Sequence, residues 1–348
     1  MNLVVRSCLV SLLVLSGPIG SFCQSAAGAL PSDPTALMNL GREKNGLAGP
    51  SLHPWHIRGT YRSYGKHGKA EYEGTYEEWW FSPTKYRRTF SGLHLTQTDY
   101  GMGTAILREG TQEWPTGAEI LLRESLIDPL PGPQVLGEFG LKRSAMKVGK
   151  ADMDCVSLTY RIPGIFPALR NVFPTACFEQ EQPILREFSI GNSSDAVYDN
   201  VTQFEGHYLA RELQIYRSRK LLADMTIDLI EPLDEQPDAI LVPPRNASPV
   251  NLTEITMTGK STEWPPVFMK VAPVYPDVAK PLRIQGTVDL EATIDMDGHV
   301  SGVQVIDGPP ALQRASADAV AKWIYRPFEV MGAPHPVRVV LHVIFSLG

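Results

Sequence analysis

Residues 286–308 read GTVDLEATIDMDGHVSGVQVIDG, and this stretch decides the fold of the last part of the chain. From residue 286 to residue 294, apolar and polar residues alternate, which is typical of a strand with one buried face and one solvated face. Asp297-Gly298 then predicts a tight hairpin, because glycine accepts positive φ. We expect residues 300–306 to form the second strand, and the run DGPP at 307–310 to end the sheet.

Two further elements complete this C-terminal unit. Residues 311–325 predict a helix, because apolar residues recur there at steps of three and four, and Pro327 ends it. A turn at Gly332 precedes a last alternating run from residue 337 to residue 347. We therefore expect residues 266–348 to form a three-stranded antiparallel sheet with one helix packed across it, which is near the minimum for an independently stable domain.

Several residues of this unit carry a family resemblance through their identity and order. They are Tyr275, Pro276, Gly286, Asp297, Gly298, Trp323, Pro327 and Gly332. With this set the unit resembles the TonB C-terminal domain family. Each residue also has an ordinary structural explanation, since aromatic side chains pack and glycines and prolines set turns. We expect mainly structural roles for the whole set.

The resemblance implies a periplasmic domain that binds an envelope partner. In that family a short extended peptide from a TonB-dependent outer-membrane receptor is added as a strand to an open sheet edge, in support of transmembrane transport. Binding would then fall on the backbone of the last strand, at Arg338, Val339, Val340, Leu341, His342, Val343, Ile344 and Phe345. The full-length transducer has an uncleaved membrane anchor and a longer spacer, so coupling of this chain to an inner-membrane motor stays open.

Residues 55–231 predict a second, larger domain that is rich in strands. Aromatic and β-branched runs with turn residues between them indicate strands at 55–64, 70–81, 85–90, 94–100, 154–161, 176–181, 184–190, 202–216 and 221–229. The spacing at 117–127 favours an amphipathic helix against the sheet. The α+β fold class that we expect thus combines a curved, half-barrel-like antiparallel sheet and helix with the smaller C-terminal unit.

This larger domain resembles the lipoprotein carriers of the LolA and LolB type. Their fold is an open antiparallel half-barrel that shelters an acyl chain, so the resemblance implies a lipid as a partner of the N-terminal domain. Apolar residues on the sheet are equally compatible with an ordinary core. The question is decided by whether the sheet encloses a continuous apolar cavity.

The segments outside the two domains have distinct compositions. Residues 1–25 read as a cleaved signal peptide, with Arg6 as the early charge and an apolar run that ends before Gly17-Pro18, which indicates export to the periplasm. Lipidation at Cys23 is the alternative, although Phe22 before it departs from the lipoprotein signal. Residues 26–54 are expected to form a polar leader, and 232–265 a Pro-rich linker that acts as a spacer.

Signal removal leaves Cys155 and Cys177 as a pair in an oxidising compartment, and we expect a disulfide between them. Two buried free thiols are the alternative. A metal site is not expected, because two cysteines without a histidine near them in sequence are too few ligands. His53 and His56 are separated by Pro54, so a helix that would bring them together is not expected either.

The composition excludes several functions. A net charge of −6 and short basic clusters do not suit a nucleic-acid-binding protein. The sequence has no nucleophile elbow, P-loop or zinc-protease motif, so we expect neither an enzyme nor a cofactor. We expect solvated faces for Glu71, Glu73, Glu77 and Glu78, and for the arginines at 87 and 88.

Two hypotheses remain: a binding module for an envelope partner, and a lipid or lipoprotein carrier whose C-terminal unit serves for docking. The sequence gives no oligomeric state.

Overall fold

The computed structural model describes residues 29–48, 52–65, 68–93, 95–115, 117–160, 173–190, 194–233, 238–252, 255–257, 265 and 267–347. The expected signal peptide and Cys23 lie outside these residues.

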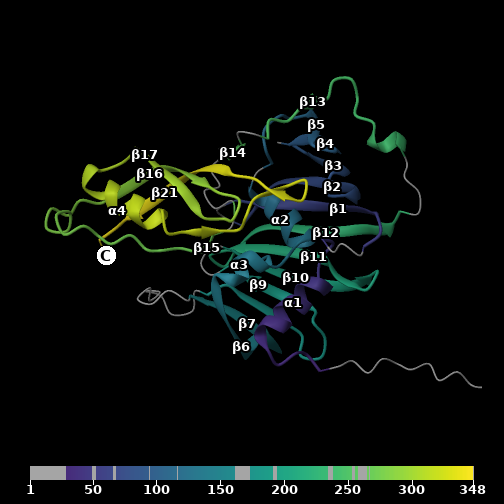
Figure 1. Cartoon of the computed structure of the whole chain (residues 1–348), viewed down its shortest axis with the longest axis horizontal. Helices are drawn as coiled ribbons and strands as arrows, with labels where there is room; N and C mark the ends of the chain where they lie inside the picture. The colour runs from purple at the N-terminus through teal and green to yellow at the C-terminus, as the bar shows by residue number, and fades with distance from the viewer. Residues whose placement is uncertain are drawn as a thin grey trace, which may run out of the picture.

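A large antiparallel sheet forms the N-terminal part of the molecule, as expected (Figure 1). Within the described residues it has 13 strands, and every neighbouring pair is antiparallel. In spatial order they are β13 (Ser248–Pro249), β5 (Ala105–Gly110), β4 (Thr96–Met102), β3 (Lys85–Gly92), β2 (Ala70–Ser82), β1 (Trp55–Tyr64), β12 (Lys220–Pro232), β11 (His207–Arg217), β10 (Asp195–Phe204), β9 (Leu185–Ser189), β8 (Thr175–Phe178), β7 (Ala151–Tyr160) and β6 (Phe139–Val148). Most strands pair with their sequence neighbours, and β1 joins the two halves by pairing with β12.

Strand alternation decides which side chains enter the core. In β1, Trp55, Ile57 and Tyr61 are buried, and Tyr61 packs edge-on against Phe90 of β3 with ring centroids 6.1 Å apart. The expected single strand at 202–216 is instead a hairpin, because Gly206 adopts a φ of +82° between β10 and β11. An Asp- or Asn-Gly signal is absent there, and the continuous alternation across both strands concealed the turn.

Helices cover the inner face of this sheet. The expected helix is present as α2 (Gly117–Ile127), which buries Leu121, Leu122 and Leu126. A further helix, α1 (Pro34–Lys44), lies within the segment that the sequence suggested to be a polar leader. Asp33 caps α1 by accepting a hydrogen bond of 2.7 Å from the Ala36 N–H. The short α3 (Pro133–Gly137) precedes β6.

The C-terminal unit has the expected three antiparallel strands and one helix, and Figure 1 shows it beside the large sheet. The strands are β17 (Val300–Asp307), β16 (Gly286–Ile294) and β21 (Val337–Phe345), with β16 in the centre, and the helix α4 (Pro310–Val320) packs against β16 and β17. The predicted end of the helix at residue 325 is wrong. The chain leaves the helix after Val320 because β18 (Ile324–Tyr325) pairs with β15 (Val267–Met269). The hairpin of β19 (Glu329–Val330) and β20 (Ala333–Pro334) follows.

The connection between the two sheets contains paired segments. Within 232–265, a 3₁₀ turn, η1 (Asp238–Leu241), precedes β13, which pairs with β5 at one edge of the large sheet. The next segment, β14 (Ile255–Met257), pairs with β21 in parallel orientation, so the small sheet gains a fourth strand that the sequence did not predict. Proline content alone therefore understated how much of this connection is held by other strands.

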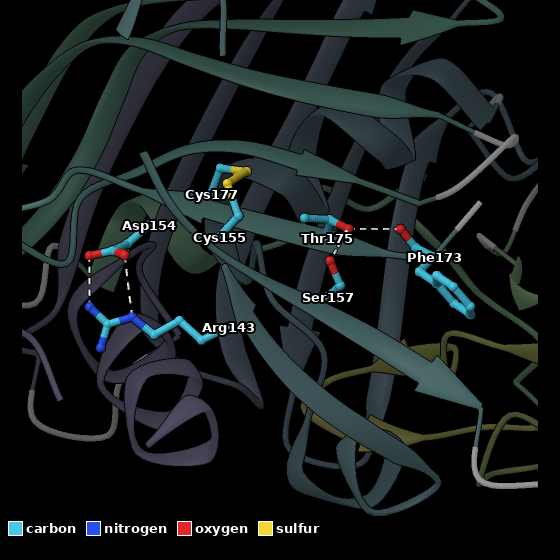
Figure 2. Close-up of a disulfide and its surroundings, with 7 residues drawn as sticks. All are labelled: Arg143, Asp154, Cys155, Ser157, Phe173, Thr175 and Cys177. Carbon is cyan, nitrogen blue, oxygen red and sulfur yellow. Dashed lines mark hydrogen bonds and ion pairs between the residues drawn. A yellow bond between two sulfur atoms is a disulfide. The ribbon is translucent and has the colours of Figure 1, made fainter. Parts of the chain in front are cut away.

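A disulfide joins the two described cysteines, as expected. Cys155 of β7 and Cys177 of β8 are register partners with Cα atoms 4.1 Å apart (Figure 2). Both are buried and pack with Met153 and Val148 in a small cluster that is separate from the main core. Around them, Figure 2 shows Ser157 and Thr175 sharing a 3.0 Å hydrogen bond across the same two strands, and Arg143 paired with Asp154.

Candidate functional site

The strand β21 is the candidate site, because the family resemblance implies that a partner would bind along its backbone. One side of β21 is fully paired: all nine residues have register partners in β16, from Val337 opposite Ile294 to Phe345 opposite Gly286. On the other side, β14 pairs only with Val337, Arg338 and Val339. From residue 340 to residue 345, no described strand pairs with this second side.

Side chains along β21 alternate between the core and the solvent. Val337, Val339, Leu341, Val343 and Phe345 are buried. Arg338, Val340, His342 and Ile344 lie on the opposite face, where His342 Nδ1 is 2.6 Å from Asp289 Oδ1 and Arg338 Nη1 is 3.8 Å from Glu291 Oε1. Ile344 is 70% exposed, which is unusual for a β-branched apolar side chain on a paired strand. The backbone edge is thus flanked by a charged face that ends in one apolar residue.

The end of β21 is fixed by the loop that precedes β16. The Tyr275 hydroxyl donates a hydrogen bond of 2.5 Å to the carbonyl of Ile284, and its ring packs edge-on against Phe345 at 5.3 Å between centroids. The Leu347 N–H donates to Gln285 Oε1 at 2.8 Å. These contacts hold the free edge in an extended conformation, which lowers the entropy cost of adding a strand to it.

The other residues of the family set lie at turns and in the core. Gly298 has a φ of +89°, and a Cβ there would lie 2.2 Å from the carbonyl oxygen of Tyr325, so only glycine fits. Trp323 is 8% exposed and donates from its indole N–H to the Val271 carbonyl at 2.9 Å. Pro276 begins a turn, through hydrogen bonds from the backbone N–H groups of Ala279 and Lys280 to its carbonyl. All these positions have structural explanations.

Glu78 is not on a solvated face. Its carboxylate is fully buried between the guanidinium groups of Arg88 and Arg123, with four hydrogen bonds of 2.9–3.1 Å, and it also accepts one from the Tyr76 hydroxyl. Burial raises the pKa of Glu78, but the two guanidinium groups outweigh burial and hold its pKa well below the usual range. The expectation of solvated residues is therefore wrong for Glu78 and Arg88, which form a structural network between β2, β3 and α2.

The two histidines that could have suggested a metal site have different partners. His53 Nδ1 lies 2.9 Å from Glu205 Oε1, whereas His56 lies between Glu77 and Glu231, 2.9 Å from each, and stacks on Trp79. In the part of the chain that the structure describes, no group of three or more His, Cys, Asp or Glu side chains is arranged to hold a metal ion.

A polar contact joins the C-terminal unit to α2. Arg326, which follows β18, lies 3.3 Å from Glu124 Oε2 and 3.4 Å from Asp128 Oδ2, and donates to the Asp128 carbonyl as well. Burial is the main reason that the pKa of Glu124 rises to about 7. The positive charges of Arg326 and Arg123 lower this pKa, and the negative charges of Glu329 and Asp128 raise it. No local pattern in the sequence predicts this contact, since its partners are about 200 residues apart.

Aromatic packing extends the contact between the two units. Arg108 is fully buried and paired with Asp99 through hydrogen bonds of 2.6 and 2.8 Å, and its guanidinium lies 5.0 Å from the ring centroid of Trp114. Trp114 in turn packs edge-on against Phe328 of the C-terminal unit at 5.7 Å. On another part of the boundary, the ring centroids of Phe188 of β9 and Phe268 of β15 are 6.4 Å apart.

A cavity of about 330 Å³ lies at this boundary, and its walls combine charged side chains with apolar and aromatic ones. Four arginines and four acidic residues line it: Arg42, Arg88, Arg123, Arg326, Asp99, Glu124, Asp128 and Glu329. An acyl chain needs an apolar wall, because burying hydrocarbon against charged groups gains little and desolvates the charges. A second space, of about 370 Å³, lies beside Arg62, Glu73 and Asp224 and is also polar. Charged groups line both of these spaces, and the lipid-carrier alternative stays a prediction.

Comparisons with known proteins identify the C-terminal unit. Residues 271–347 match the family of the Gram-negative bacterial TonB protein C-terminal domain, so this part of the chain is a TonB C-terminal domain. Over 86 residues the chain is 29% identical to the protein TonB of Klebsiella pneumoniae, which covers 24% of this chain. The chain thus spans about a third of the length of this relative, 35%. Members of the matched family are generally not enzymes.

The solved structures that resemble the chain match its larger part. A LolA superfamily protein from Nitrosomonas europaea aligns with a TM-score of 0.39 and 11% identity, over 61% of this chain and 99% of that protein. A DUF1329 family protein from Desulfovibrio piger aligns with a TM-score of 0.38 and 8% identity, over 61% of this chain and 98% of that protein. No helix within the described ranges is both long and apolar enough to cross a membrane.

Proposed function

We propose that this chain is a periplasmic binding protein that adds an extended peptide of an envelope partner to the edge of β21, in support of transport across the outer membrane. The observation that carries the proposal is the backbone edge at residues 340–345, which no described strand pairs with, in a domain of the TonB C-terminal family. The partner class is a TonB-dependent outer-membrane receptor, because that family receives receptor peptides as strands.

Main-chain hydrogen bonds would supply most of the affinity in this proposal. An open edge offers N–H and C=O groups at a fixed spacing, and a partner strand satisfies them irrespective of most of its side chains. His342 and Asp289, which contact each other, are 42% and 37% exposed, so their contact would adjust partner choice more than binding free energy. Export to the periplasm fits the disulfide, which persists in an oxidising compartment.

Proline substitution tests the proposal at single residues. Successive residues of a strand direct their N–H groups to opposite edges, so one of Val340 and Leu341 donates toward β16 and the other toward the free edge. Val340→Pro and Leu341→Pro should therefore differ: the variant that breaks the pairing with β16 loses stability, while the other stays folded and no longer binds.

The measurement is capture of receptors from detergent-solubilised outer membranes by the immobilised protein, with identification of the captured chains by mass spectrometry. The wild type should enrich TonB-dependent receptors, and the folded proline variant should not. His342→Ala is the matched control, because it removes a side chain from the same strand but leaves the backbone edge intact, and it should retain most of the capture. Equal capture by the wild type and by the proline variant that circular dichroism shows to be folded would show that the partner docks elsewhere.

A further inference from the structure

The strand β14 occupies residues 337–339 of the β21 edge, next to the free stretch at 340–345, so a partner strand that extends along more of β21 needs this part as well. Ile255, Thr256 and Met257 are register partners of Val337, Arg338 and Val339, in parallel orientation. The segment comes from this chain itself, from the connection between the two sheets. Ile255 is only 2% exposed and belongs to the main core, so the pairing is anchored by a buried side chain as well as by the backbone.

The pairing of β14 is short compared with the edge that is available. It covers three residues of β21, whereas β16 pairs with nine on the other side. Parallel pairing is also slightly less stable per residue than antiparallel pairing. Burial of the Ile255 side chain adds a hydrophobic contribution to this short pairing. The connection holds β14 near this edge because β13 pairs with β5 before it and β15 pairs with β18 after it.

A tethered strand competes with a free peptide for the same edge. Short tethers give effective concentrations in the millimolar range, so a weak intramolecular pairing can still occupy its site most of the time. The apparent dissociation constant of an incoming peptide is then its intrinsic value divided by the fraction of molecules whose edge is free. A peptide that pairs along more of β21 gains hydrogen bonds that β14 lacks, and this difference allows it to displace β14.

We propose that β14 is a built-in competitor that covers the first part of the β21 edge and is displaced by the partner strand. The inference rests on the proposed function, since it concerns the same edge. It defines the partner chemistry more closely: an extended segment longer than three residues, with an apolar side chain at the position that Ile255 occupies. It also implies that partner binding loosens the connection between the two sheets.

The test uses the sequence of the competitor as the probe. A fluorescent peptide with the sequence of residues 250–259, VNLTEITMTG, is titrated into the full-length protein and two variants. Ile255→Asp places a charge at a buried position and should expel β14, whereas Ile255→Val keeps the β-branched apolar side chain and serves as the matched control. The peptide should bind Ile255→Asp at least tenfold more tightly than it binds the wild type, and Ile255→Val should behave as the wild type does.

Two further measurements make every outcome decisive. A peptide with aspartate at the isoleucine position should not bind any of the proteins. Thr256→Pro, which removes a β14 backbone N–H without adding a charge, should reproduce the gain if Ile255→Asp proves unstable. Equal peptide affinity for the wild type and a folded β14 variant would overturn the inference, and so would no binding to either. If the gain appears but outer-membrane receptors are not captured, the competitor stands and the proposed function falls.

Discussion

Glu124 lies at the contact between the two units, and its protonation state affects the stability of the protein. Its side chain is 14% exposed. It faces Arg326 from the C-terminal unit, Arg123 of α2, Asp128 just after α2, and Glu329 of β19. Burial raises its pKa from 4.5 to about 7, so the native state binds a proton more tightly than the unfolded chain does. The stability that comes from this proton is present below the unfolded pKa and is lost as pH rises through about 7.

The first prediction concerns Glu124→Gln, which keeps the shape and removes the titration. The free energy of unfolding of the wild type should fall, relative to that of the variant, by up to about 3 kcal/mol between pH 5 and pH 8. Denaturant titrations of both proteins at four pH values measure this difference. The raised pKa of Glu329 has the same sign and is present in both proteins, so the difference between their pH curves reports mainly on Glu124. Parallel pH curves for the two proteins would contradict the prediction.

Single residues differ in how well the sequence foretold their surroundings. Alternation in β2 places Glu78 on the same face as Tyr76 and Trp80, so the sequence did indicate that this carboxylate points inward. The prediction of a solvated side chain was wrong because it followed from the charge of the residue and not from its position in the strand. Its partner Arg123 comes from α2, 45 residues away, and no local pattern specifies that pairing. Turn glycines were easier to predict, because Gly298 is required by local backbone geometry that leaves no room for a Cβ.

Elements with a clear period were predicted with their bounds, and elements fixed by distant partners were not. The expected strand at 55–64 and helix at 117–127 coincide with β1 and α2, since both have a strong periodic pattern ended by turn residues. The helix α1 was missed although Asp33-Pro34 is a helix-start signal, because few apolar residues follow it. The pairing of β14 with β21 joins residues about 80 apart, and a run of three residues has no period to detect.

The second prediction concerns β7 and β8, which the disulfide joins. Cys155→Ser combined with Cys177→Ser should lower the free energy of unfolding by about 3 kcal/mol, because the bridge closes a loop of 22 residues in the unfolded chain. The backbone register of the two strands does not depend on the sulfur atoms, so far-UV circular dichroism should change little. Denaturant unfolding with and without reductant measures the effect.

Thiol titration gives the control for the disulfide. A chain that starts at residue 29 contains only these two cysteines, and in the denatured, unreduced state neither should react. Two reactive thiols would contradict the pairing, and an unchanged midpoint of the double serine variant would contradict its contribution to stability.

At the scale of the whole molecule, the two sheets share one core. Buried side chains from both belong to a single continuous cluster, and Phe188 with Phe268 and Trp114 with Phe328 lie on the boundary. The sequence suggested two domains separated by a spacer, and a spacer would leave them to unfold independently. A continuous core and strand pairing at both ends of the connection predict that the two parts unfold together in one cooperative transition.

The third prediction follows from that shared core. The wild type should unfold in a single transition, with intrinsic fluorescence and far-UV circular dichroism coinciding. Arg326→Ala removes a guanidinium that pairs with Glu124 and Asp128 at the boundary, and should lower the free energy of unfolding by about 1–3 kcal/mol because these buried polar groups lose a partner. Arg314→Ala is the matched control, because Arg314 is 94% exposed and its pair with Asp318 at 3.8 Å contributes little. Two separate transitions in the wild type, or equal stability of the two arginine variants, would show that the sheets are joined by the connection alone.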